Sequence, residues 1–288
     1  MRKIKYINML RIITDSSSDL RLDEYKEKNI ELISLNVTFD DKCYKEESEL
    51  GKEKFYELLL NSESFPKTSQ PSPYDLMNIL EDAKKNNDEV LGIFLSSKVS
   101  GTFNSCMMIK NTVELDNCYF IDSLTGSCGL RILLDEAVKL RDEGKNIKEI
   151  VDRIEALKHH IKLYVVADTL DYLAKGGRIS SFSSKIGNLL KFKPLLEVKD
   201  GKVEVLSKPR GLKSAMEELI LQIVNDQVDD NYPVCAIYSI AKDNVLKLVE
   251  KLTLTGIEVS LDNIYLIGAV IGSHLGPNGF GLVYVSKA

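Results

Sequence analysis

The stretch VLGIFLSSKVSGT, residues 90–102, reads as a strand, a polar turn and the beginning of a helix. VLGIFL is a short apolar run, as expected for a strand that is buried on both faces. Ser and Thr are preferred where helices begin, and we expect a helix from about Gly101. A strand that leads directly into a helix is the unit from which parallel sheets with helical coverings are built.

The same alternation continues on both sides of this stretch. The apolar run from Ile7 to Ile13 and the alternating residues 31–39 are expected to form strands. Pro73 suits the first position of a further helix. Another strand and two more helices are expected at residues 118–121, 126–143 and 147–160. We therefore predict an N-terminal α/β domain with a mostly parallel sheet that is covered by helices on both faces.

The second half of the chain has a different order of predicted strands and helices. Its strongest signal is at residues 193–207, where Asp200-Gly201 separates two strand-like runs, an arrangement typical of a hairpin. Other strands and helices are expected at residues 163–168, 212–227, 234–240, 244–253 and 281–285. Antiparallel strands mixed with helices favour an α+β domain. We predict an α/β domain at residues 1–160 and an α+β domain at residues 161–288.

The bulk composition argues against several classes of protein. The 288 residues carry a net charge of -5 with both signs interspersed, which argues against a nucleic-acid-binding protein. Five scattered cysteines without a C-x-x-C pair favour reduced residues in or near the core over a disulfide framework. The N-terminal MRKIKYINML lacks a signal-peptide core, and no run approaches the ~18 apolar residues of a transmembrane span. We expect a cytoplasmic protein without an integral membrane segment.

Small polar residues follow three strands of the N-terminal half. They form the stretches TDSSSD (14–19), SSKVSGT (96–102) and DS (122–123). The carboxyl ends of parallel strands meet at one edge of a sheet, which is where open α/β sheets bind ligands. The residues expected at this edge are Asp15, Ser16, Ser96, Ser97, Ser100, Gly101, Thr102, Asp122 and Ser123. Any one of them could be a helix cap, but together they favour a ligand site.

The tripeptide Ser100-Gly101-Thr102 is the most informative part of this edge. Gly101 lets the backbone approach a ligand closely, and the helix that follows offers unpaired N–H groups. Two hydroxyls add neutral donors, so the arrangement suits one carboxylate or a single phosphate. The sequence contains neither GxxxxGK[ST] nor a GxGxxG after a strand, which argues against a nucleotide.

The three histidines differ in their surroundings. His159 and His160 end a charged helix, where solvated side chains near the C-terminal dipole are expected. His274 lies in IGSHLGPNGFG, residues 271–281, which predicts a glycine-rich loop. It reads as an ordinary loop histidine or, because the flanking glycines allow close packing, as a ligand contact.

Two arginines follow short stretches that end or interrupt an element. In DTLDYLAKGGRIS, residues 168–180, we expect a helix that ends at Gly176 in the left-handed conformation. Arg178 would then be presented outward, toward a partner. KPRG, residues 208–211, offers a second exposed arginine, Arg210, after the hairpin.

These pieces, in this order, resemble the DegV family along essentially the whole chain. The matching stretches are ITDSSSDL (13–20), KTSQPSP (67–73), SSKVSGTFNS (96–105), the Asp122-Ser123 turn, DTLDYLAKGGRIS, KPRG and IGSHLGPNGFG. The resemblance implies two α/β domains with a fatty acid between them and its carboxylate held by polar side chains. Members resemble the fatty-acid-binding subunit of the bacterial fatty acid kinase, which presents acyl groups to a separate ATP-binding kinase subunit.

Carried over by motif, Thr68, Ser100 and His274 resemble the carboxylate ligands of the family, with Gly101 and Thr102 beside them. Arg178 and Arg210 resemble residues that dock the kinase. The expected rim of the ligand pocket comprises Asp15, Ser16, Ser97, Asp122 and Ser123. The chain departs from the family pattern at Arg131, where a small residue is common.

The sequence therefore predicts a non-catalytic carrier of a long-chain fatty acid, with no cofactor and no metal site. At ~0.8 kcal/mol per buried methylene, a long acyl chain contributes on the order of 10 kcal/mol before ordering costs. One alternative is a serine hydrolase that uses Ser100, His274 and Asp122, although Ser100 lacks the G-x-S-x-G elbow. Another is a protein that binds a small phosphorylated metabolite at the same helix terminus.

Overall fold

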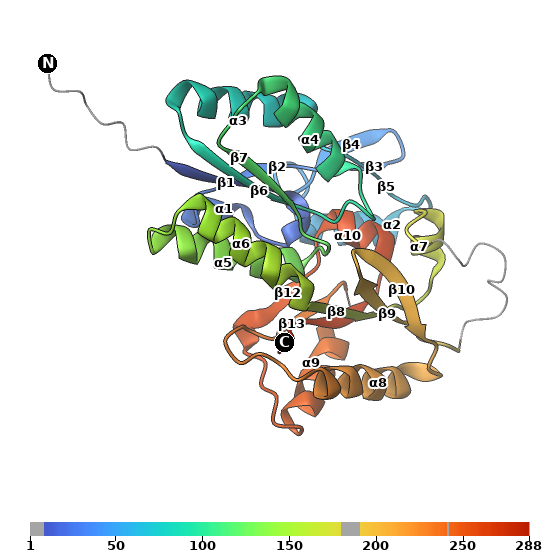
Figure 1. Cartoon of the computed structure of the whole chain (residues 1–288). Helices are drawn as coiled ribbons and strands as arrows, with labels where there is room; N and C mark the ends of the chain where they lie inside the picture. The colour runs from blue at the N-terminus through green and yellow to red at the C-terminus, as the bar shows by residue number, and fades with distance from the viewer. Residues whose placement is uncertain (1–8, 180–190, 241, 288) are drawn as a thin grey trace, which may run out of the picture.

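The computed structural model describes residues 9–179, 191–240 and 242–287 (Figure 1). Ile7 and Asn8 of the first predicted strand, and Ser180 at the end of DTLDYLAKGGRIS, lie outside these ranges. The described strands form a four-stranded parallel sheet, a six-stranded mixed sheet and a three-stranded antiparallel sheet. The predicted α/β fold class, with a parallel sheet flanked by helices and a second, mixed sheet, is confirmed.

The parallel sheet is built from strands of the N-terminal half in the order β2-β1-β6-β7. The bounds of these strands are β1 Leu10–Asp15, β2 Ile30–Ile33, β6 Glu89–Phe94 and β7 Cys118–Asp122. Successive residues of β1 point to opposite faces, so Ile12 and Ile13 belong to two different core clusters. Both faces are therefore buried, as predicted.

Helices cover both faces of this sheet (Figure 1). One face packs against α3 Pro73–Asn86 and α4 Thr102–Val113. The other packs against α1 Leu22–Glu27, α5 Cys128–Asp142 and α6 Ile147–Leu157. Short 3-10 turns follow β1 and α6 at η1 Ser16–Ser18 and η2 Lys158–His160.

The six-stranded sheet has the order β10-β9-β8-β13-β11-β12. Its strands are β8 Ile161–Val166, β9 Leu195–Lys199, β10 Lys202–Ser207, β11 Cys235–Tyr238, β12 Ile264–Leu266 and β13 Phe280–Val285. One face is covered by α8 Gly211–Asp226 and α9 Lys242–Thr253. Residues of the other face join the core cluster of α5 and α6, so this face is turned toward the N-terminal half.

A small antiparallel sheet lies beside the parallel one (Figure 1). Its strands are β3 Asn36–Phe39, β4 Lys42–Lys45 and β5 Lys67–Ser69, and α2 Lys52–Asn61 connects the last two. In the register of this sheet Thr68 lies opposite Val37. The small sheet thus fixes the position of Thr68.

Three local predictions need correction. Residues 31–39 are not one strand, because β2 pairs with β1 whereas β3 pairs with β4 and β5. The glycine-rich stretch around His274 is not a loop throughout, since α10 Ala269–Leu275 includes the histidine. After α7 Asp171–Lys175 the left-handed residue is Gly177, with φ 70°, and not Gly176, with φ -74°.

Other predictions agree with the structure. Asp200 and Gly201 both have positive φ, 48° and 80°, and form the predicted turn between β9 and β10. Four of the five cysteines are buried, as expected, whereas Cys43 is exposed. Arg131 is buried, and its guanidinium pairs with Glu24, which compensates its charge.

The division of the chain into domains at residue 160 stays a prediction. The parallel sheet ends at Asp122 and the six-stranded sheet begins at Ile161, so the two sheets draw their strands from either side of that point.

Over the ranges that the structure describes, every helix is too short or too polar to cross a membrane. The remaining element is the 3-10 turn η3 Leu261–Asn263.

Candidate ligand-binding site

A cavity of about 610 Å³ lies between the two halves of the chain. This volume is in the range of small-molecule pockets. Its larger part is an apolar wall that we define by Leu35, Leu95, Val99, Leu163, Val165, Leu173, Leu196, Val198, Val203, Ile237, Ile267, Val270, Ile271 and Leu275. Several of these residues project from the face of the six-stranded sheet that is turned toward the N-terminal half.

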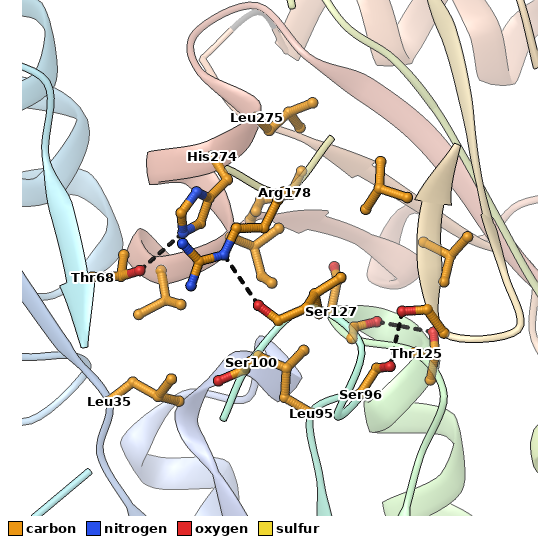
Figure 2. A pocket seen from close by; sticks show the side chains of 18 of the residues that line it. Leu35, Thr68, Leu95, Ser96, Ser100, Thr125, Ser127, Arg178, His274 and Leu275 are labelled. Carbon is orange, nitrogen blue, oxygen red and sulfur yellow. Dashed lines mark hydrogen bonds between the residues drawn. The ribbon is translucent and has the colours of Figure 1, made fainter. Parts of the chain in front are cut away.

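The cavity also has a polar end, defined here by Thr68, Ser100, Arg178 and His274 (Figure 2). Thr68 comes from β5, Ser100 from the loop after β6, and His274 from α10. Thr68 Oγ1 lies 2.9 Å from His274 Nε2. Three residues that are distant in the sequence therefore line one pocket, together with Gly101. Their role as ligand contacts stays a prediction.

His274 is neutral at physiological pH. Burial, and to a smaller extent the positive charge of Arg178, lower the pKa of its imidazole to about 4. Its Nδ1 atom is buried and has no hydrogen-bond partner among the residues that the structure describes. The ring lies close against Gly176, where a Cβ atom would be 2.2 Å from Nδ1. A glycine is therefore needed at position 176 because any side chain there would collide with the His274 ring, and not because the backbone is left-handed.

Arg178 lies next to His274 in the pocket (Figure 2). Its Nε donates to the carbonyl oxygen of Val99 at 3.1 Å, and its Nη1 donates to that of Gly176 at 2.5 Å. Burial lowers the pKa of the guanidinium, which nevertheless stays charged at neutral pH. The sequence suggested an outward arginine, but the side chain lines the cavity. A role in partner docking stays a prediction.

The loop Ser100-Gly101-Thr102 supplies one hydroxyl to the pocket instead of two. Ser100 lines the cavity, and its Oγ lies 2.8 Å from the Oγ1 of Thr102, which is fully buried behind it. Gly101 is the N-cap of α4, and a Cβ atom there would be 2.1 Å from Gln70 Nε2. Ser105 donates to the side-chain oxygen of Gln70 and holds it over the loop. Thr102 therefore orients Ser100 and does not line the pocket itself.

The predicted rim residues converge at the edge of the sheet, but they do not line the cavity. Asp15 is buried and accepts the amide of Leu95 at 2.7 Å, and desolvation raises its pKa. Asp122 accepts the amide of Ser97 at 3.1 Å. The remaining two, Ser16 and Ser123, are also buried and hydrogen-bonded within the protein. These five residues hold the loops of the sheet edge in place, and among them only Asp15 is a helix cap, the N-cap of η1.

Sequence reasoning placed Ser96 at this edge of the sheet but missed several other residues of the lining. The missed residues are the polar Thr125, Ser127 and Glu197, and the apolar wall was not predicted residue by residue. Ser96 Oγ donates to the carbonyl of Gly201 at 2.8 Å, which joins the hairpin turn to the loop after β6. The position of Ser96 after a strand was a usable signal. The aliphatic residues carried none, because they would look the same in a solid core.

The geometry does not favour a hydrolase. Ser100 is hydrogen-bonded to Thr102, and His274 to Thr68, while Asp122 accepts the amides of Ser97 and Leu124. A catalytic triad needs hydrogen bonds from serine to histidine and from histidine to aspartate. Neither occurs in the described part of the chain.

Two observations outside the cavity concern partner docking and metal binding. Arg210 is exposed after the hairpin, with its guanidinium 5.3 Å from the ring centroid of Phe192. Over residues 9–179, 191–240 and 242–287, no three His, Cys, Asp or Glu side chains are grouped so that they could hold a metal ion.

Comparisons with known proteins agree over nearly the full length. The family model described as "Uncharacterised protein, DegV family" matches residues 9–287. A DegV domain-containing protein of Caldanaerobacter subterraneus is 33% identical over 278 residues, 96% of this chain and 99% of that protein. Among solved structures, a fatty-acid-binding DegV family protein from Streptococcus agalactiae has a TM-score of 0.88 and 29% identity, covering 98% of this chain and 100% of that one. A DegV family protein from Thermus thermophilus, described by its fatty acid binding, has a TM-score of 0.86 and 28% identity, covering 97% and 100%.

Proposed function

The chain belongs to the DegV family, and from this premise we propose that it carries a long-chain fatty acid and presents its carboxylate to a partner kinase. The observation that supports this most is the pairing of an apolar wall with a small polar end in one cavity of about 610 Å³. An amphiphile with one polar group matches such a cavity.

The polar end suits a carboxylate. Thr68 and Ser100 supply hydroxyl donors, and the neutral imidazole of His274 supplies a donor or an acceptor according to its tautomer. Arg178 adds one positive charge, which matches the single negative charge of a carboxylate. An anion bound here would be both hydrogen-bonded and compensated in charge.

The apolar wall suits the acyl chain. Burial of methylene groups against its Leu, Ile and Val side chains would supply most of the affinity, at ~0.8 kcal/mol per methylene. The residues that define the wall are all aliphatic, and within the described part of the chain the one charged side chain that lines the cavity outside the polar end is Glu197, which would repel a phosphate. A phosphorylated metabolite of similar size would leave this surface without a matching partner.

The carrier role follows from where the carboxylate would lie. Ser69 and Gln70 follow Thr68, line the cavity and are exposed to solvent, so the acid group would be reachable from outside. We propose that a separate ATP-dependent kinase subunit approaches this side and that Arg210 contacts it. In this account the chain itself performs no chemistry and needs no cofactor.

Identification of the co-purifying ligand tests the proposal. Native mass spectrometry of the purified protein, followed by mass analysis of the extracted ligand, should give a mass in the fatty acid range. The solved relatives from Streptococcus agalactiae and Thermus thermophilus are described as binding fatty acid, which supports this expectation. A phosphate ester, or phosphorylation or hydrolysis of the ligand by the purified protein alone, would contradict the carrier.

A further inference from the structure

Two buried carboxylates from the N-terminal half lie against the beginning of α10. The amide of Gly268 donates to Asp19 Oδ1, and the amide of Val270 donates to Glu46 Oε1, each at 2.7 Å. Both amides belong to the first turn of the helix, where N–H groups have no partner within the helix. Gly268, the N-cap, has no side chain that could accept them. The acceptors are instead Asp19 and Glu46, which lie 249 and 224 positions away in the sequence.

The two residues before Gly268 are held through their carbonyl oxygens. Lys52 Nζ donates to Leu266 at 3.2 Å, and the hydroxyl of Tyr56 donates to Ile267 at 3.0 Å. Both side chains come from α2 and are buried. The connection from β12 to α10 is therefore hydrogen-bonded by four side chains of the N-terminal half.

Close packing makes this arrangement specific. A Cβ atom on Gly268 would lie 2.7 Å from Glu46 Oε1 and 3.0 Å from Asp19 Oδ1. Contacts this short would displace the carboxylates from the amides that they accept. A glycine at the N-cap thus lets both carboxylates reach the first turn of α10.

The second oxygens of the same carboxylates hold the opposite side of the pocket. Ser16 Oγ donates to Glu46 Oε2 at 2.6 Å and accepts the amide of Leu35 at 3.0 Å. Ser127 Oγ donates to Asp19 Oδ2. Leu35 and Ser127 both line the cavity. Each carboxylate therefore joins α10 to the loops of the N-terminal half that form the pocket.

We propose that Glu46 and Asp19 are positioning residues for the polar end, because they fix α10 and with it the imidazole of His274. This inference rests on the proposed function. His274 follows Val270 by one helical turn, and its Nε2 lies 2.9 Å from Thr68 Oγ1. When the first turn of α10 loses its acceptors, the imidazole shifts relative to Thr68 and the acid group is held less well.

The test measures the preference for an acid over its ester. Dissociation constants for stearic acid and methyl stearate are determined with the wild-type protein and with Glu46→Ala, Glu46→Gln and Glu46→Asp. A positioning role at the polar end changes the ratio of the two constants, since only the acid uses the full set of donors. A general loss of core stability weakens both ligands alike and leaves the ratio unchanged.

We expect Glu46→Ala to lower the preference for the acid about tenfold. Glu46→Gln should keep the preference within about twofold of the wild-type value, which is less than the change expected from the loss of one good hydrogen bond. The amide oxygen of Gln can accept from Val270 and its N–H can donate to Ser16. Glu46→Asp should not restore the preference, because the shorter side chain cannot reach both partners.

Glu136→Ala is the matched control. Glu136 is a buried carboxylate that accepts from Arg153 and Tyr232 and does not line the cavity. This variant should melt at a lower temperature and keep the wild-type preference. A wild-type preference in Glu46→Ala overturns the inference, and if that variant does not fold, a wild-type preference in Glu46→Asp overturns it. No preference for the acid in the wild-type protein contradicts the proposed function itself.

Discussion

The polar end and the apolar wall of the pocket are built by different means. The wall consists of aliphatic residues that project from one face of the six-stranded sheet and from the segments opposite it. The polar end consists of four residues from separate segments, each held by a hydrogen bond, as in the pairs of Thr68 with His274 and Ser100 with Thr102. One aliphatic residue can replace another of similar volume at small cost, whereas a displaced donor is lost. The wall should therefore set affinity, and the polar end should set selectivity for an acid.

The largest effect is expected from a charge placed in the wall. Val203→Asp puts an unpaired carboxylate against the acyl chain, and fatty acid affinity should fall at least about a hundredfold. Leu206→Asp is the control, because Leu206 lies in the same strand β10, is 39% exposed and does not line the cavity. Isothermal titration with stearic acid compares the two. Equal affinities would mean that the acyl chain lies elsewhere.

The next effect separates the two arginines. Arg178→Ala should weaken binding of stearic acid about thirtyfold, since a charged hydrogen bond at the polar end is removed. Arg210→Ala should leave this affinity unchanged and reduce acyl-phosphate formation when a partner kinase is added. The same titration, followed by a kinase assay, measures both. If Arg178→Ala binds as the wild type does, its guanidinium does not contact the acid group.

A smaller effect is expected from the hydroxyls. Thr68→Ala and Ser100→Ala each remove one neutral donor, and the affinity for stearic acid should fall about tenfold in each. The affinity for methyl stearate should change less than that for the acid. Val203→Ile, a change of one methylene in the wall, should act on both ligands equally. An equal loss for acid and ester in the hydroxyl variants would remove the distinction between the two regions.

The last prediction concerns the free energy of unfolding and not affinity, and it tests the acidic group of Glu46 behind the polar end. Burial, with smaller contributions from nearby Asp19 and Glu47, raises the pKa of Glu46 from 4.5 to about 8, against the hydrogen bonds from Ser16 and Val270. The stabilisation linked to its neutral form is complete below pH about 4.5 and is lost as the pH rises toward 8. Glu46→Gln stays neutral, so its free energy of unfolding should gain on the wild type across this range, by less than about 1.4 kcal/mol per pH unit. Urea titrations at several pH values measure this, and parallel profiles would mean that the pKa of Glu46 is not raised in the folded protein.

The sequence predicted the elements that carry strong periodicity or clear turn chemistry. The strand and helix around residues 90–102 and the Asp200-Gly201 hairpin agree with the structure because local preference and tertiary packing favour the same conformation. Residues 31–39 were misjudged, since alternation alone does not reveal that the chain passes from one sheet to another at Ser34-Leu35. α10 was missed because Gly272 and Gly276 resemble loop residues.

The candidate site was predictable at its polar end only. Hydroxyls and a histidine in unusual glycine-rich settings are rare enough to stand out, as Ser100 and His274 did. A wall residue such as Val165 or Ile237 has no such mark, because the same alternation fits a solid core. The part that Glu46 plays could not be predicted from the sequence either, because it depends on a hydrogen bond from an amide 224 positions away.

The most direct measurement is a crystal structure of the chain with stearic acid. We expect the carboxylate within hydrogen-bonding distance of Thr68, Ser100 and His274, and the acyl chain along Val165, Val203 and Ile237. A fatty acid bound in the reverse direction, or a cavity that stays free of ligand at saturating concentration, would contradict the account.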